Sequence, residues 1–259
     1  MTDYQWLRVN AEGALLTITL SSIERRNALS PAMGAELLDA LGAFEADPDA
    51  AVLVLTGDGS DFCAGADLRG GLGQAPSGSP GDFADLLLRL AKLEKPSIAK
   101  VRGYALGAGL GLVAGCHFAV GAESSILGAP EIDRGLFPMM ILAVLDRIMA
   151  RRDLLRLTLL GQKLPAAEAQ RLGILSEVVS EEALDAHVES LARKLAGQSP
   201  EAMARGLRAL HEQAEMPLEE ALPHLRDRLM ELLATDDARE GLRAFAEKRP
   251  PRWKVRTDS

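Results

Sequence analysis

Residues 97–112, SIAKVRGYALGAGLGL, place a short apolar run directly before a glycine-rich turn. Residues 51–68, AVLVLTGDGSDFCAGADL, follow the same order and end in a second glycine-containing turn. Apolar runs of this length, closed by glycine, predict strands. Because α/β folds bind ligands at the carboxyl ends of their strands, the two turns are the first candidates for a functional site.

The segments around these turns predict further strands and a helix. WLRVN (6–10) and GALLTITL (13–20) are rich in β-branched residues and leucine. The segment 31–47, PAMGAELLDALGAFEAD, spaces its apolar residues as a helix does, with Ser30 as the cap and Pro48 as the stop. This alternation of strands and helices predicts an α/β fold with a largely parallel sheet.

The chain changes character at two places. Residues 70–81, GGLGQAPSGSPG, contain five glycines and two prolines, which predicts a mobile loop. After about residue 140 the strand pattern gives way to helical patterns, except at ILSEVVS (174–180). The last stretch keeps Leu233, Leu242 and Phe245 among many charges, and this amphipathic pattern predicts docking onto the core or a neighbouring subunit.

The composition is that of a globular protein, with 259 residues, 47% apolar and 25% charged. The 29 basic and 37 acidic residues give a net charge of −8, and no basic stretch is interleaved with aromatics, so a nucleic-acid partner is not expected. Cys63 and Cys116 lack the spacing of a zinc site or redox pair and are expected in the core. Because no signal-like start or membrane-spanning apolar run is visible, we expect a cytoplasmic protein.

Candidate catalytic groups are few. The sequence lacks G-x-S-x-G, P-loop and H-E-x-x-H motifs, and His187, His211 and His224 lie in charged helical stretches that favour surface or structural roles. Each glycine turn could supply one backbone N–H to a single oxygen, which is the arrangement of an oxyanion hole. The glycines could equally serve only tight turns and close helix packing.

Glu131 is the acid best suited to proton transfer, because GAPEIDRGLFP (128–138) places it among apolar and turn residues. Burial raises the pKa of a carboxyl group and suits it to general acid/base work. Such a glutamate can instead cap a helix or pair with a cation, here Arg134. The run GLGLVA (109–114) also matches the G-x-G-x-x-A dinucleotide fingerprint, which keeps an NAD-dependent dehydrogenase as an alternative, although no strand ending in an acid follows at the required distance.

Taken together, six segments resemble the enoyl-CoA hydratase/isomerase family, also called the crotonase superfamily. They follow the family's order and spacing over almost the whole chain: RRNALS (25–30), DFCAGADL (61–68), KPSIAKVRGYALGAG (95–109), GAPEIDRGLFP (128–138), LLGQKLPAAEAQRLGILSEVV (159–179) and EGLRAFAEKR (240–249). The resemblance implies a spiral of repeated ββα units over residues 1–195. It also implies a helical region over 196–259 that assembles homotrimers, often paired as hexamers.

The resemblance further implies an acyl-CoA thioester as substrate, with no metal and no cofactor beyond the CoA that the substrate carries. The backbone N–H groups of Ala66 and Ala108 would hold the thioester oxygen of an enolate, and Glu131 would act as general acid/base. The CoA path would be lined by Arg26, Ala28, Leu29, Ala64, Asp67 and Leu68, with Lys248 reaching the adenine-phosphate end from the same or a neighbouring subunit.

The chain departs from the family's hydratases at one catalytic position. Those enzymes usually carry a second glutamate twenty residues before the one that Glu131 matches, and Gly111 stands there instead. His117 replaces a common aspartate, and Met139 and Met140 replace small residues, which reshapes the acyl pocket. A glutamate restored at position 111 is expected to raise hydration if the pocket has room.

We therefore expect an enoyl-CoA hydratase/isomerase that acts on a fatty or branched enoyl-CoA. Isomerisation is favoured over hydration, because one carboxylate can remove a proton from C2 of a 3-enoyl-CoA and return it to C4. Decarboxylation or hydrolysis of an acyl-CoA stays open as an alternative, as does a catalytically silent CoA-binding member, because fold resemblance does not fix function.

Overall fold

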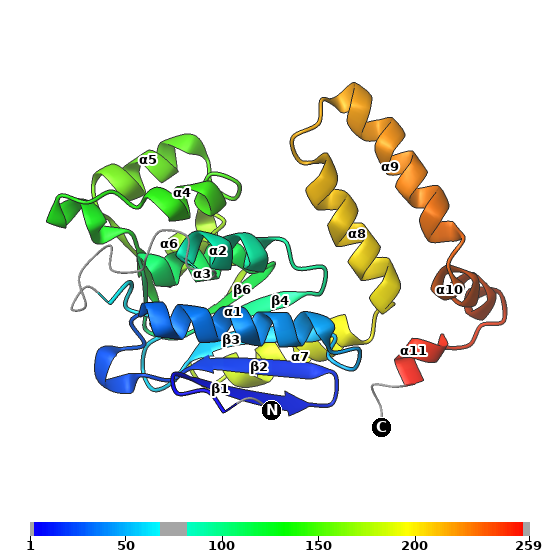
Figure 1. Cartoon of the computed structure of the whole chain (residues 1–259), viewed down its shortest axis with the longest axis horizontal. Coiled ribbons are helices and arrows are strands. Elements are labelled where there is room, and N and C mark those ends of the chain that lie inside the picture. Colours follow the sequence, from blue (N-terminus) through cyan, green and yellow to red (C-terminus); the bar gives the residue numbers. More distant parts are fainter. Residues whose placement is uncertain (1–2, 68–81, 256–259) are drawn as a thin grey trace.

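The computed structural model describes residues 3–67 and 82–255 of the chain. Its centre is a six-stranded sheet in the order β1-β2-β3-β4-β6-β9 (Figure 1). β1 and β2 form an antiparallel hairpin, whereas every pair from β2 to β9 is parallel, as the alternating pattern predicts. The strands are β1 (Leu7–Glu12), β2 (Leu15–Leu20), β3 (Val52–Gly57), β4 (Ser97–Val101), β6 (Phe118–Ala122) and β9 (Glu177–Val179).

A second, smaller sheet begins where the strands of the first one end. It contains β5 (Tyr104–Leu106), β7 (Ile126–Gly128) and β8 (Lys163–Pro165), in the order β5-β7-β8. β4 leads into β5 and then α3 (Ala108–Gly115), and β6 leads into β7, η3 (Pro130–Arg134) and α4 (Met139–Leu145). This repetition of two strands and a helix confirms the ββα architecture that the resemblance implies.

Two expectations about strands are wrong in detail. The sequence pattern predicts a glycine-rich turn over 103–112 and helical patterns from about residue 140 to 174, yet the strands β5 and β8 lie there. Strands of three residues are too short to show the alternation that identifies a strand in a sequence. Their partners in the second sheet decide their conformation.

Helices cover both faces of the large sheet. On one face, α1 (Pro31–Ala46), α2 (Phe83–Ala91) and α3 enclose the main apolar core, and the Ser30 Oγ accepts the Met33 N–H at 3.2 Å, which confirms the predicted cap. On the other face, α7 (Leu184–Ala196) packs against a separate apolar cluster. That cluster contains Val52, Val54, Ile98, Val120, Leu184 and Val188.

The described chain after about residue 140 is mostly helical, as expected, with β8 and the predicted strand β9 within it. α8 (Pro200–Gln213) and α9 (Leu218–Leu233) form a hairpin beside the core, and α10 (Asp236–Ala246) and α11 (Arg252–Val255) follow it (Figure 1). The division expected after residue 195 falls at the end of α7. The loop predicted over 70–81 lies outside the described residues. Among the residues that are described, no helix has the length and hydropathy needed to cross a membrane.

Candidate functional site

The two glycine turns lie against each other. The Cys63 N–H donates to the Tyr104 carbonyl at 2.9 Å, and the Leu106 N–H donates back to the Cys63 carbonyl at 3.0 Å. Gly65 and Gly107 both have positive φ, at 111° and 52°, where a side chain would be strained. A Cβ at Gly107 would lie 3.8 Å from the Gly65 Cα, so the turns are in van der Waals contact.

One turn opens helix α3, and the first N–H groups of the helix precede its hydrogen-bond ladder. The first bond of the helix ladder runs from the Gly111 N–H to the Gly107 carbonyl at 3.0 Å. The N–H of Ala108 precedes that bond, so it has no partner within the helix. It therefore points outward at the positive end of the helix dipole.

The other turn directs the Ala66 N–H away from its neighbouring strand. Leu29 donates to the Gly65 carbonyl at 2.8 Å and accepts from the Asp67 N–H at 3.0 Å, so the pairing uses the groups on either side of Ala66. Among the hydrogen bonds of the described residues, none is donated by the N–H of Ala66 or Ala108. These two N–H groups are thus available donors on touching turns, which is what an oxyanion hole requires.

Glu131 lies over the start of α3. It belongs to η3, directly after β7, and a Cβ at Gly107 would lie 2.8 Å from its Oε1. Its Oε2 is buried and has no hydrogen-bond partner among the described groups. Burial raises the pKa of Glu131, opposed by its own backbone N–H and by the charge of Arg134. Arg134 itself donates to the Pro130 carbonyl at 3.3 Å.

The position of the missing second acid is filled with hydrocarbon. Gly111 is buried in α3, and a Cβ there would lie 2.5 Å from Cγ2 of Ile141 and 3.3 Å from Cζ of Phe83. Ile141 comes from α4 and is 2% exposed, and Phe83 is the first residue of α2. The structure therefore leaves no room for a glutamate at position 111 unless Ile141 moves, which removes the condition for the expected gain in hydration.

The dinucleotide fingerprint does not form a nucleotide-binding turn. Gly109 and Gly111 both lie inside α3 rather than between a strand and a helix. A Cβ at Gly109 would lie 2.5 Å from the Cys63 carbonyl oxygen, so this glycine serves close packing of the helix on the first turn. The geometry that would support an NAD-dependent dehydrogenase is not present in this helix.

The RRNALS segment (25–30) pairs with residues 64–67, AGAD, which form the first glycine turn. The Ala64 N–H donates to the Arg26 carbonyl at 2.9 Å, which extends the pairing made by Leu29. The Arg26 side chain is exposed, lies over the Tyr104 ring at 5.3 Å and approaches Asp61 at 3.5 Å. These contacts bring the main chain of the predicted CoA-lining residues 26–29 and 64–67 together.

Asn27 is a structural residue that the sequence analysis misses. It is fully buried, with φ at 55°, a conformation that asparagine tolerates better than most residues. Its amide donates to the carbonyls of Asp58 and Asp61 at 2.9 and 2.7 Å, and its Oδ1 accepts the Ser22 N–H at 2.9 Å. An asparagine within the RRNALS segment was the available signal.

One predicted site residue is not brought to the turns, and another, Leu68, lies outside the described residues. Lys248, with φ at 53°, lies between α10 and α11, in the helical region that stands apart from the core (Figure 1). A role for Lys248 at this chain's own turns is therefore not supported by its position.

Other reactive groups are held in structural positions. A hydrogen bond of 2.9 Å joins His117 Nδ1 to Ser97 Oγ, and the His117 ring stacks on His211 of α8. Burial lowers the pKa of His117 to about 4. Burial raises the pKa of Cys63 to about 11 and that of Cys116 to about 12, so both remain thiols. Within the described part of the chain, no three His, Cys, Asp or Glu side chains group closely enough to hold a metal ion.

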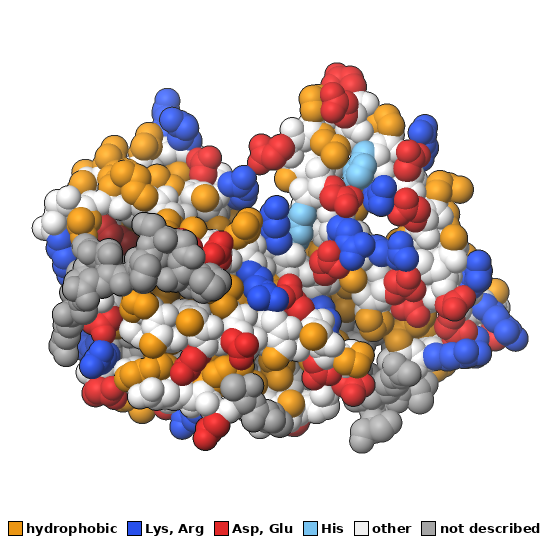
Figure 2. Space-filling view, viewed as in Figure 1, with side chains coloured by type: hydrophobic (Ala, Val, Ile, Leu, Met, Phe, Trp, Pro, Cys, Tyr) orange, Lys and Arg blue, Asp and Glu red, His pale blue; other side chains and the backbone are white. Residues whose placement is uncertain are grey.

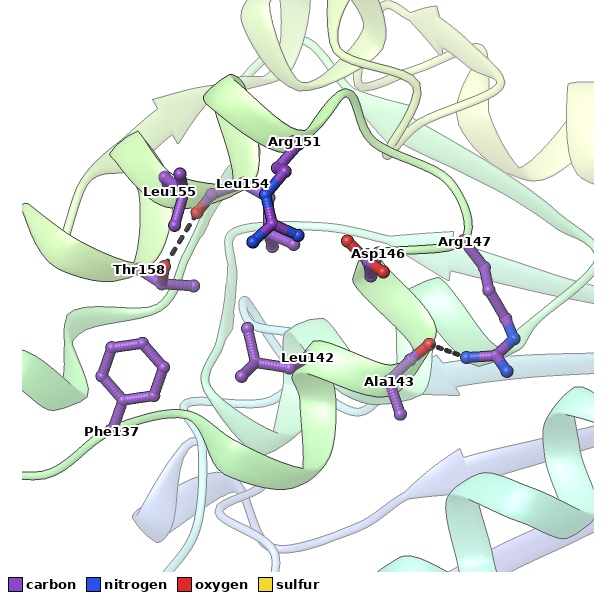
Figure 3. Close-up of a pocket in the computed structure, with 9 residues that line it drawn as sticks. All are labelled: Phe137, Leu142, Ala143, Asp146, Arg147, Arg151, Leu154, Leu155 and Thr158. Atoms are coloured by element: carbon purple, nitrogen blue, oxygen red, sulfur yellow. Dashed lines mark hydrogen bonds between the residues drawn. The ribbon is translucent and has the colours of Figure 1, made fainter.

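A pocket of about 340 Å³ lies between α4 and α5 (Arg151–Leu159). Leu142 and Phe137 line it on one side and Arg151 points into it from the other (Figure 3). Its walls contain none of the predicted catalytic residues, and Leu142 faces α5 here, whereas Ile141 packs at Gly111. The pocket is therefore separate from the paired turns.

A parallel sheet whose strands pass through paired glycine turns into a second small sheet, with the half-buried Glu131 at those turns, is the architecture of a crotonase-superfamily enzyme. The enoyl-CoA hydratase/isomerase family model matches residues 10–256. The chain belongs to this family.

Known relatives align with nearly the full length of this chain. A Rhizobium meliloti protein named "probable enoyl-CoA hydratase" is 35% identical over 256 residues, covering 98% of this chain and 100% of that protein. The 2,3-dehydroadipyl-CoA hydratase of Escherichia coli is 33% identical, covering 96% and 99%. The crystal structure of an enoyl-CoA hydratase from Mycobacterium smegmatis superposes with a TM-score of 0.89 at 31% identity, covering 96% and 98%.

Proposed function

We propose that this enzyme acts on a fatty or branched enoyl-CoA with Glu131 as its single general acid/base, and that it favours double-bond isomerisation over hydration. The observation that carries the preference is the apolar filling at Gly111 by Ile141 and Phe83. Positioned proton-transfer groups are worth about 10²–10⁴-fold each, so loss of one acid weighs against water addition.

The proposed reaction uses the free N–H groups and one carboxylate. The N–H groups of Ala66 and Ala108 donate to the thioester oxygen and stabilise the negative charge that develops there. The Glu131 carboxylate removes a proton from C2 of a 3-enoyl-CoA, and the electron pair moves into the enolate. The same group, now a carboxylic acid, returns the proton to C4, so the double bond moves to C2–C3 and no other reactant is consumed.

The buried position of Glu131 supports this role. A raised pKa keeps the conjugate acid available after the first proton transfer, which the return step requires. The substrate supplies its own CoA, so the proposal includes no further cofactor and no metal.

Hydration is the second candidate, because relatives are named as hydratases. A single glutamate with an ordered water would have to perform it here. Incubation with a 2-enoyl-CoA and, separately, a 3-enoyl-CoA in ¹⁸O-labelled water separates the two reactions. Conjugation of the 3-enoyl substrate without label supports isomerisation, and label in the product of the 2-enoyl substrate supports hydration.

Glu131→Gln tests the acid directly. The amide keeps the volume of the carboxylate but cannot accept a proton, so we expect turnover to fall by about 10²–10⁴-fold while acyl-CoA affinity is retained. The measurement is kcat by absorbance together with Kd by calorimetry. Turnover close to that of the wild type would reject Glu131 as the acid/base. Turnover on neither enoyl substrate by the wild type would redirect the search to decarboxylation, hydrolysis or the silent CoA-binding role.

We further propose a homo-oligomer, a trimer or a pair of trimers, assembled through the C-terminal helices. Leu233, Leu242 and Phe245 are 44%, 64% and 86% exposed, so this chain's own core does not cover them. A second copy of the chain would cover these three side chains. In such an assembly Lys248 would contribute to the CoA site of a neighbouring copy rather than to its own.

A further inference from the structure

Ile141 packs against α3 close to the site of the predicted chemistry. Gly107 is the residue that precedes α3, and the Gly111 N–H donates to its carbonyl at 3.0 Å, so the two glycines are one hydrogen-bonded turn apart. The Glu131 carboxylate lies over Gly107, and Ile141 lies over Gly111. An acyl chain that ran from Glu131 along α3 would therefore meet Ile141 next.

The surroundings of Gly111 contain hydrocarbon where a water would need polar partners. The three heavy atoms nearest to a Cβ at Gly111 are Cγ2 and Cβ of Ile141 and Cζ of Phe83. A bound water needs about two to four polar partners. The β-branched side chain of Ile141 is stiff about χ1, and at 2% exposure it has little freedom to swing away.

We propose that Ile141, backed by Phe83, determines the reaction outcome by keeping water out of the space beside the reacting carbons. The inference rests on the proposed function, in which Glu131 carries the proton from C2 to C4. With water excluded, the proton on Glu131 returns to the substrate before it exchanges with solvent. Ile141 is thus a specificity-determining residue, and it takes no part in the proton transfer itself.

The test compares Ile141→Val with Ile141→Thr. The two variants have nearly the same shape, because threonine carries a hydroxyl where valine carries a methyl group. The loss of packing is therefore similar in both, and only the polarity of the side chain differs. Each is incubated with a 3-enoyl-CoA in deuterium oxide, and deuterium at C4 of the product is measured by mass spectrometry. A second incubation with a 2-enoyl-CoA in ¹⁸O-labelled water measures hydration.

We expect the wild type and Ile141→Val to retain substrate protium at C4, and Ile141→Thr to show severalfold more deuterium and severalfold more ¹⁸O product. Leu142→Thr is the control, because it adds a hydroxyl to the same helix on the side that faces the α5 pocket (Figure 3). This control should match the wild type in both isotope ratios. Equal ratios in Ile141→Val and Ile141→Thr would overturn the inference.

A failure of the proposed function leaves a separate result. If the wild type isomerises no 3-enoyl-CoA, the affinities of the two variants for butyryl-CoA still test whether Ile141 borders the acyl chain. Severalfold weaker binding by Ile141→Thr than by Ile141→Val would support a contact between Ile141 and the acyl chain. Equal affinities would contradict that contact.

Discussion

At the scale of single residues, the position of Glu131, the proposed general acid/base, destabilises the charged form of its side chain. Its carboxylate is half-buried, one oxygen has no described partner, and burial raises its pKa. The folded state therefore disfavours the ionised form. Stabilisation by the neutral carboxyl is complete below the pKa of the unfolded chain and is lost as the pH rises through the higher pKa of the folded chain.

Glu131→Gln should accordingly stabilise the fold at neutral pH. The amide cannot ionise, so we expect the difference in Tm between the variant and the wild type to be near zero at acid pH and to grow toward neutrality. Each kcal/mol gained corresponds to about 2–4 °C for a chain of this size. Scanning calorimetry across the pH range measures it, with Asp133→Asn as an exposed control on the same turn. A difference that is constant with pH would contradict the raised pKa.

Gly107 is the residue whose substitution should displace the acid. An alanine there combines a φ of 52° with a Cβ 2.8 Å from the Glu131 Oε1. Misplacement of a catalytic group by about 1 Å can cost 10²-fold, so Gly107→Ala should lower kcat by roughly that factor. Gly206→Ala, at a helical position with open space, is the control for kcat. Equal kcat in both variants would show that the carboxylate does not need this position.

At the scale of elements, Asn27 holds the loop that pairs with the AGAD turn. Asn27→Ala would leave the carbonyls of Asp58 and Asp61 and the Ser22 N–H without their buried partner. We expect a loss of about 2–4 kcal/mol in the free energy of unfolding. Urea denaturation measures it, and Asn10→Ala, at an exposed strand position, should change stability by less than about 0.5 kcal/mol. A small loss at Asn27 would mean that water replaces its hydrogen bonds.

The elements also show which parts of the fold a sequence can predict. The strands at 6–10, 13–20, 51–57 and 97–101 and the helix after Ser30 carry their pattern over five or more residues, and all are present. β5 and β8 are three residues long, and their pairing partners are distant in sequence, so no local pattern marks them.

The candidate site divides in the same way. Glycine turns after strands and an acid among apolar residues are visible in the sequence, and the family resemblance assigns Ala66, Ala108 and Glu131 to one site at these turns. The filling of the Gly111 position is not visible, because Ile141 and Phe83 come from two other helices and only their packing brings them there. Gly111 alone indicates a missing acid but not what takes its place.

At the scale of the whole molecule, ion pairs on the surface connect the C-terminal helices to the core. Ion pairs between exposed side chains link α8 and its following turn to the core, at Arg208–Glu94 and Arg147–Glu215. A notch separates this region from the lobe that carries α4 and α5 (Figure 2). The helices expose large apolar side chains: Leu210, Leu218, Leu222, Leu229, Met230, Leu233, Leu242 and Phe245. Large apolar side chains exposed in this number support the assembly proposed above.

We therefore expect a solution mass that is a multiple of 27.6 kDa and that depends on these side chains. The double variant Leu242→Ser/Phe245→Ser should shift the protein toward the monomer in light scattering. Ile23→Ser, at an apolar position that is 57% exposed and far from these helices in sequence, should leave the mass unchanged. A monomeric wild type would contradict the proposed assembly.

The main-chain pairing between residues 26–29 and 64–67 has a consequence for regiochemistry. Three hydrogen bonds of 2.8–3.0 Å join the segment proposed to hold the CoA arm to the turn proposed to hold the carbonyl. The covalent length from nucleotide to carbonyl is the same in every acyl-CoA. A substrate fixed by this paired segment therefore presents the same carbon to Glu131 whatever chain follows, so homologous acyl groups should differ in rate but not in the bond that reacts.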